Sequence, residues 1–210
     1  MLLLDEVNKR SPIDGRLKTQ NLTFLFELKG QACGLRMAHY RFLRYTHGPF
    51  SPTLAEDLKR LHELEFFSGA GNVLTKRGRF IVDYVSDWVS SSSLGRKTHE
   101  IVVEIAKKYG KLSGIAIRDL VLAMNIPVAE HAERLEKIAD VPILVDLIDP
   151  ERKSGLTDVR LPSRLCRELG EEFALDPSAL NPSKASYIQS VRKALKAAEE
   201  LIPIESSARS

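Results

Sequence analysis

The sequence has few cysteines and no long apolar run. Among 210 residues only Cys33 and Cys166 are cysteine, without CxxC spacing, so we expect reduced, mostly buried thiols instead of a bridge or zinc site. No apolar run approaches the ~20 residues that cross a bilayer. The opening Met1–Leu4 is too short for a signal peptide and lacks a preceding basic stretch. We therefore expect a cytoplasmic protein with no membrane partner.

Catalytic and cofactor motifs are also missing from the sequence. It contains no GxSxG, P-loop, GxGxxG or HExxH pattern. The five histidines lie apart from any second ligand at metal-site spacing, and the aspartates show no pairing typical of acid–base catalysis. We therefore predict that the protein is not an enzyme and holds neither a cofactor nor a metal.

The composition is that of an ordinary globular protein, with 43% hydrophobic and 28% charged residues. The formal charge is +3, and residues 1–95 carry all of it, with 13 Lys/Arg against 10 Asp/Glu. Strong nucleic-acid binders usually show a larger excess or a clear basic stripe. Charge alone therefore neither requires nor excludes DNA.

Apolar periodicity predicts a mostly helical chain. A segment rich in aromatic and basic residues at 37–45 indicates a short strand or an extended segment, and residues 66–75 indicate a small β-ribbon with a glycine tip. Residues 159–162 are expected to be extended, and 141–147 form a short apolar segment of uncertain type. The predicted helices are 2–8, 16–29, 53–65, about 75–88, 97–109, 114–124, 128–139, 163–173 and about 186–202.

Capping residues mark several of the expected helix ends. Asp14 is expected to cap the helix at 16–29, and Gly30 to stop it. Ser51, followed by Pro52 at the first helical position, is expected to cap the helix at 53–65. Gly110 is expected to end the helix at 97–109.

The predicted fold is mostly α with a small β-ribbon. Helix, short helix and ribbon form the outline of a winged helix, which we place in residues 1–90. Residues 91–148, after the serine run 90–93, continue the same domain as helices, and 149–210 form a C-terminal helical extension.

Several short motifs in the first 125 residues resemble one known family. They are the run from Pro12 to Phe26, the YTHGPFSP element at 45–52, LTKRG at 74–78 and YGKLS at 109–113. Together they are similar to the motifs of YwgA-like proteins and the related Panacea (SocA-type antitoxin) domains. The resemblance implies a compact, mostly helical, non-catalytic module that in some relatives neutralises a toxin by direct protein contact.

Two segments are candidate contact surfaces. The first holds Arg36, Arg41, Arg44 and His47 among aromatic residues, which suits a phosphate-facing or acid-binding edge. The same pattern also fits core aromatics with merely solvated arginines.

The second candidate follows the ribbon and carries Lys76, Arg77 and Arg79, which we interpret as a wing; a charged helix start fits it equally. The helix at 53–65 carries Glu56 and Asp57 near its N-terminus. Carboxylates there repel phosphate, which argues against DNA reading by this helix.

The tail supports a separate hypothesis. Residues 157–162, including Arg160, followed by two helices, are similar to a ribbon-helix-helix DNA-binding unit. Asp158 beside Arg160 argues against it, as does the long connection 174–183 with its two prolines. A helical hairpin packed on the core or on another copy is the other interpretation.

We therefore expect a non-catalytic binding protein, antitoxin-like or regulatory, whose partner is a protein such as a cognate toxin. The alternative is a DNA-binding transcriptional regulator, and a homodimer is left open. If the first candidate segment is a free surface, charge reversal at Arg41 and Arg44 should weaken partner binding and leave thermal stability nearly unchanged.

Overall fold

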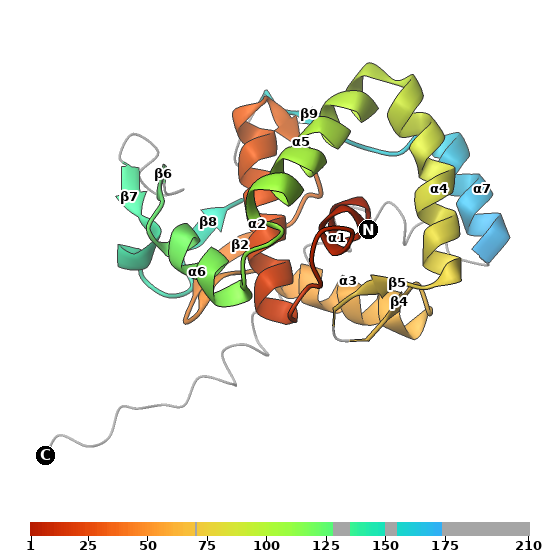
Figure 1. The fold of residues 1–210 in the computed structure, drawn as a ribbon. Coiled ribbons are helices and arrows are strands. Elements are labelled where there is room, and N and C mark those ends of the chain that lie inside the picture. Colours follow the sequence, from red (N-terminus) through yellow and green to blue (C-terminus); the bar gives the residue numbers. More distant parts are fainter. Residues whose placement is uncertain (70, 128–134, 150–154, 174–210) are drawn as a thin grey trace, which may run out of the picture. The chain divides into compact units, whose positions relative to one another are not determined.

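The computed structural model describes residues 1–69, 71–127, 135–149 and 155–173 (Figure 1). The chain divides into two compact units, Met1–Leu161 and a second unit that begins at Pro162. Helices dominate the described residues and the strands are short, so the expected mostly α fold with small β elements is confirmed. Within the described part, no helix is long and apolar enough to cross a bilayer.

The elements of the first unit follow one another with short connections. They are α1 (Leu2–Asn8), α2 (Arg16–Ala32), β1 (Leu35–Arg36), β2 (Phe42–Tyr45), β3 (Gly48–Phe50), α3 (Pro52–Glu63), β4 (Phe67–Ser68), β5 (Val73–Leu74), α4 (Lys76–Ser91), α5 (Ser93–Tyr109), α6 (Gly114–Leu122), β6 (Asn125–Pro127), β7 (Leu135–Lys137), the 3-10 turn η1 (Ile138–Asp140), β8 (Asp146–Ile148) and β9 (Thr157–Asp158).

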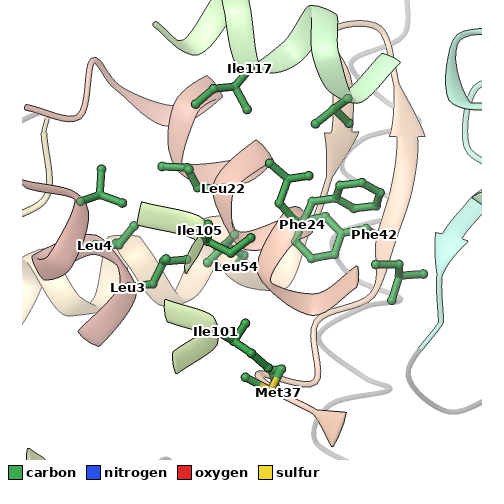
Figure 2. Packing of buried hydrophobic residues seen from close by; sticks show 14 of the residues in the cluster. Leu3, Leu4, Leu22, Phe24, Met37, Phe42, Leu54, Ile101, Ile105 and Ile117 are labelled. Carbon is green, nitrogen blue, oxygen red and sulfur yellow. The ribbon is translucent and has the colours of Figure 1, made fainter. Parts of the chain in front are cut away.

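Helix α2 is the centre of the first unit, with α5, α6 and the β2–β3 strands around it (Figure 1). Leu22 and Phe24 are completely buried, and the Phe24 ring meets Phe42 of β2 edge to face at 5.5 Å. Figure 2 shows this cluster, in which Ile105 of α5 and Ile117 of α6 join the apolar side chains of α2. Burial of this apolar area is the main stabilising contribution to the fold.

Several polar side chains of α2 are buried as well, and Lys18, Thr19 and Gln20 form hydrogen bonds inside the unit. The Gln20 amide donates to the Ser51 carbonyl at 3.0 Å, while its oxygen accepts from the Ser51 N–H at 2.9 Å. Asn72, before β5, donates to the Thr19 hydroxyl at 3.0 Å. A buried polar group without a partner costs about 1–3 kcal/mol. These bonds therefore fix the positions of α3 and the β4–β5 hairpin relative to α2.

Two sheets tie distant parts of the sequence to this centre. Strand β2 pairs antiparallel with β3 on one side and with β8 on the other, so β8 closes the sheet from far along the chain. Strand β9 pairs parallel with β1, with the Thr157 N–H donating to the Gly34 carbonyl and the Val159 N–H to the Arg36 carbonyl, both at 2.9 Å.

The caps at Ser51 and Gly110 are confirmed. The Ser51 hydroxyl accepts from the Leu54 N–H with Pro52 at the first helical position, and Gly110 is the C-cap of α5.

Two cap predictions for α2 are wrong. Asp14 does not cap α2, because the N-cap of this helix is Gly15. The Asp14 carboxylate accepts instead from the distant Gly114 N–H. Gly30 lies inside α2, where an added Cβ would meet the Met37 side chain at 2.1 Å. That glycine therefore serves helix packing and not helix ending.

Two element predictions also need correction. Residues 135–137, expected within a helix at 128–139, form β7 paired with β6, and residues 128–134 lie outside the described part. The predicted strand or extended segment 37–45 is regular only at β2, because residues 37–41 are a loop with His39 at φ +60°. Backbone N–H groups of this loop donate to the Glu27 carboxylate, as described below, and these bonds hold the loop in its conformation.

The second unit is described through residue 173. It contains α7 (Ser163–Phe173), which agrees with the expected helix, and the Arg164 guanidinium pairs with Glu168 one turn later at 2.7 Å. The helix expected at about 186–202 and the two proline turns before it lie outside the described residues.

Candidate interaction surface

Arg36 and Arg41 of the first candidate segment are bound to carboxylates of the same unit. Arg36 on β1 contacts Asp158 on β9 at 2.8 Å. Arg41 makes two parallel bonds to Asp146 on β8, at 2.6 and 2.5 Å, and the Asp146 side chain is only 8% exposed. Such bidentate pairs are specific in geometry and stabilise the buried carboxylate. Both arginines therefore hold strands together.

Arg44 is also used internally. Its guanidinium donates to the Ile138 carbonyl at 2.9 Å and to the Tyr45 carbonyl, and burial lowers its pKa. His47, in contrast, is exposed in the turn between β2 and β3. The segment thus combines three structural arginines with one exposed histidine. Charge reversal at Arg41 or Arg44 is now expected to lower stability, which revises the expectation of unchanged stability.

The second candidate segment is the first turn of α4 and not part of the β-ribbon. The ribbon itself is the β4–β5 hairpin, with Phe67 opposite Leu74. Thr75 caps α4, since its hydroxyl accepts from the Gly78 N–H at 3.1 Å. Lys76, Arg77 and Arg79 are therefore cations at a helix N-terminus, where the helix dipole disfavours positive charge by about 0.3–1 kcal/mol each.

Each of these cations has a different environment. Arg79 pairs with the buried Asp5 of α1 at 2.8 Å, and this pair raises the Arg79 pKa. Arg77 lies over the Phe66 ring at 5.1 Å from its centroid. Lys76 is exposed. Arg79 thus joins α1 to α4, while Lys76 and Arg77 face outward.

Two exposed apolar residues border these cations. Val73 of β5 and Phe80 of α4 are each 48% exposed. Phe80 lies one helical turn after Lys76, and therefore on the same side of α4. We call Val73, Lys76, Arg77 and Phe80 the wing surface. Its aromatic residue Phe80 and its arginine Arg77 are of the types enriched in protein–protein contact surfaces.

Helix α3, which would be the recognition helix of a winged helix, presents carboxylates. Glu56 and Glu63 are exposed, and Lys59 lies 3.6 Å from Glu63. Asp57 is half-buried and accepts from the Tyr40 hydroxyl at 2.9 Å; burial raises its pKa. The acidic face predicted from the sequence is thus present at Glu56, whereas Asp57 fastens the loop before β2.

Arg160, the candidate residue of the tail, follows β9. It is exposed and lies 3.2 Å from Asp158, which also binds Arg36. The strand that a ribbon-helix-helix unit would pair with a second copy is paired here with β1 of the same chain. The second helix of that hypothesis lies outside the described residues.

Sequence reasoning missed Glu27 on α2, a buried carboxyl whose pKa is raised. Its side chain is completely buried, and its carboxylate accepts from the Ala38 N–H at 2.5 Å and the Met37 N–H at 3.4 Å. Burial raises the pKa of Glu27 to about 7, against the opposing effect of the backbone N–H groups of residues 37–40. A charged residue amid apolar neighbours in a predicted core helix is the signal that could have indicated it.

The two cysteines are free thiols, and Cys33 is half-buried. Within the described residues, no group of three or more His, Cys, Asp or Glu is placed to hold a metal ion. Comparisons with protein families, with curated proteins and with solved structures find no match for this chain. Function must therefore be argued from the surfaces described above.

Proposed function

We propose that this chain is a non-catalytic binding protein that acts by direct contact with a partner protein, as the resemblance to YwgA-like and Panacea domains implies. In this proposal the fold is winged-helix-like, with α3 as the short helix and the β4–β5 hairpin as the wing. The wing surface is the contact site. A cognate toxin is the kind of partner that the resemblance implies.

The wing surface carries the proposal. Cations in the first turn of α4 oppose the helix dipole, and no acidic residue of that turn offsets them. Arg79 is engaged by Asp5 and Arg77 lies over the Phe66 ring, and both Lys76 and Arg77 are exposed near the exposed Val73 and Phe80. A partner with carboxylates around an apolar contact would relieve the electrostatic cost and cover the apolar area.

The alternative of a sequence-specific DNA-binding regulator has less support. Exposed Glu56 and Glu63 on α3 would face the phosphates of a duplex bound by that helix. Homodimer formation through the tail strand would require β9 to leave β1.

The proposal can be tested with the gene that neighbours the gene encoding this chain. Expressed alone, its product should arrest growth, and co-expression with this chain should restore growth and yield a purified complex. The variant Lys76→Glu/Arg77→Glu should bind at least ten-fold more weakly and lose the rescue. The matched control Lys107→Glu/Lys108→Glu, at exposed positions on α5, should retain both. A harmless neighbour that does not co-purify, or equal losses in both variants, would refute the proposal.

A further inference from the structure

A second charged surface lies where α2 and α6 begin and α5 ends. Figure 1 shows the first turns of α2 and α6 side by side. The Gly114 N–H donates to Asp14 Oδ2 at 3.0 Å, and the Lys18 ammonium donates to the Gly110 carbonyl at 2.8 Å. These bonds fasten the α5–α6 turn to the start of α2, so cations from both segments share one end of the unit.

Four exposed cations lie on these segments: Arg16 on α2, Lys107 and Lys108 in the last turn of α5, and Lys111 in the turn that follows. We call these four residues the basic corner. Within 12–18 and 107–114, the only carboxylate is that of Asp14, and it accepts the Gly114 N–H.

Neighbouring carboxylates offset only part of the charge of the basic corner, since Asp14 keeps its negative charge when it accepts the Gly114 N–H. Glu104, one turn before Lys107 and Lys108, lies 2.8 Å from Lys29. Lys18, only 2% exposed, lies beneath the corner and donates to the Pro12 and Gly110 carbonyls, so its charge is met by dipoles. Burial lowers the pKa of Lys18, while nearby Asp14 opposes that shift. The corner therefore carries a local positive excess that the small net charge of the chain conceals.

We propose that the basic corner binds the phosphate backbone of a nucleic acid without reading its sequence. Lysine ammonium groups suit phosphate oxygens as point charges. The corner segments carry no asparagine or glutamine to read base edges. Among the described residues, Ile115, 59% exposed at the start of α6, is the only large exposed apolar residue on these segments, which gives the corner little of the apolar centre of a stable protein interface.

The experiment measures binding of the full chain to a 24-base-pair DNA duplex of arbitrary sequence, and to an RNA duplex of equal length, from 50 to 200 mM salt. Four phosphate contacts predict that affinity falls about 100-fold over this range, through counterion release. The variant Lys107→Gln/Lys108→Gln/Lys111→Gln should flatten the slope of log affinity against log salt by roughly 3.

A variant of equal net charge serves as the control. Lys59→Gln/Lys97→Gln/Lys137→Gln removes three exposed cations elsewhere on the first unit and should leave duplex binding within about two-fold. No binding to either duplex at 50 mM salt would overturn the proposal, as would equal losses in both variants.

Discussion

At the scale of single residues, several charged side chains of the described part are structural. Arg36, Arg41 and Arg79 each meet a carboxylate on another element, and Glu27 meets backbone N–H groups. Cations that look alike in the sequence therefore differ in what their removal should do.

Removal of the Arg41 side chain should lower stability. In Arg41→Ala, the buried Asp146 carboxylate loses both guanidinium bonds. Loss of charged hydrogen bonds at a partly exposed pair predicts a cost of about 2 kcal/mol, measured by urea unfolding. The double variant Arg41→Ala/Asp146→Ala should lose less than the sum of the two single changes. Unchanged stability of Arg41→Ala would show that the pair is not structural.

Glu27 should make stability depend on pH. Because its folded pKa is raised from 4.5 to about 7, its protonated form favours the folded state. That contribution is fully present below pH 4.5 and is lost as pH rises through 7, by about 3 kcal/mol in all. Urea unfolding at pH 4.5 to 8 should show this loss in the parent protein and its absence in Glu27→Gln.

The control for the Glu27 prediction is Glu100→Gln, which removes an exposed carboxylate from α5. Parallel pH profiles of the parent protein and Glu27→Gln would contradict the linkage.

At the scale of elements, close approach at one glycine fixes how α4 meets the hairpin. A Cβ on Gly78 would lie 2.1 Å from the Phe66 carbonyl oxygen. Although Gly→Ala usually stabilises a helix interior, Gly78→Ala should destabilise the protein by about 1–3 kcal/mol because backbone atoms must move apart. Thermal unfolding measures the change, with the exposed Asp83→Ala on the same helix as control. A higher melting temperature for Gly78→Ala would contradict the close approach.

The elements also show which predictions local sequence supports. Helices α3 and α5 could be predicted because their signals are local. These signals are the Ser51 cap followed by Pro52 at the start of α3, and the apolar spacing within both helices. The prediction of a helix at 128–139 is wrong at residues 135–137, where strand pairing with β6 overrides the helical apolar pattern.

At the scale of the whole molecule, the pairing of charges could not be predicted from the sequence. With 31 cations and 28 anions, local pattern does not say which ones meet. Asp14 looked like a helix cap because its true partner, the Gly114 N–H, lies a hundred residues away. Arg36, Arg41 and Arg44 were likewise predicted to form a surface because their partners, Asp158, Asp146 and the Ile138 carbonyl, lie far away in the sequence. Of the candidate residues, His47, Lys76, Arg77 and Arg160 lie exposed on the surface, and their role in binding stays a prediction.

The antiparallel pairing of β2 with β8 has a consequence for synthesis. During translation, β2 is synthesised about a hundred residues before β8. Until β8 is made, one edge of β2 lacks its partner strand and the Arg41 guanidinium lacks the Asp146 carboxylate. The growing polypeptide is therefore exposed to wrong strand pairing for about half of its translation. A nascent chain stalled before Asp146 has left the ribosome should be far more sensitive to protease than one stalled after residue 161 has left it, which the fragment pattern of stalled ribosome complexes would reveal.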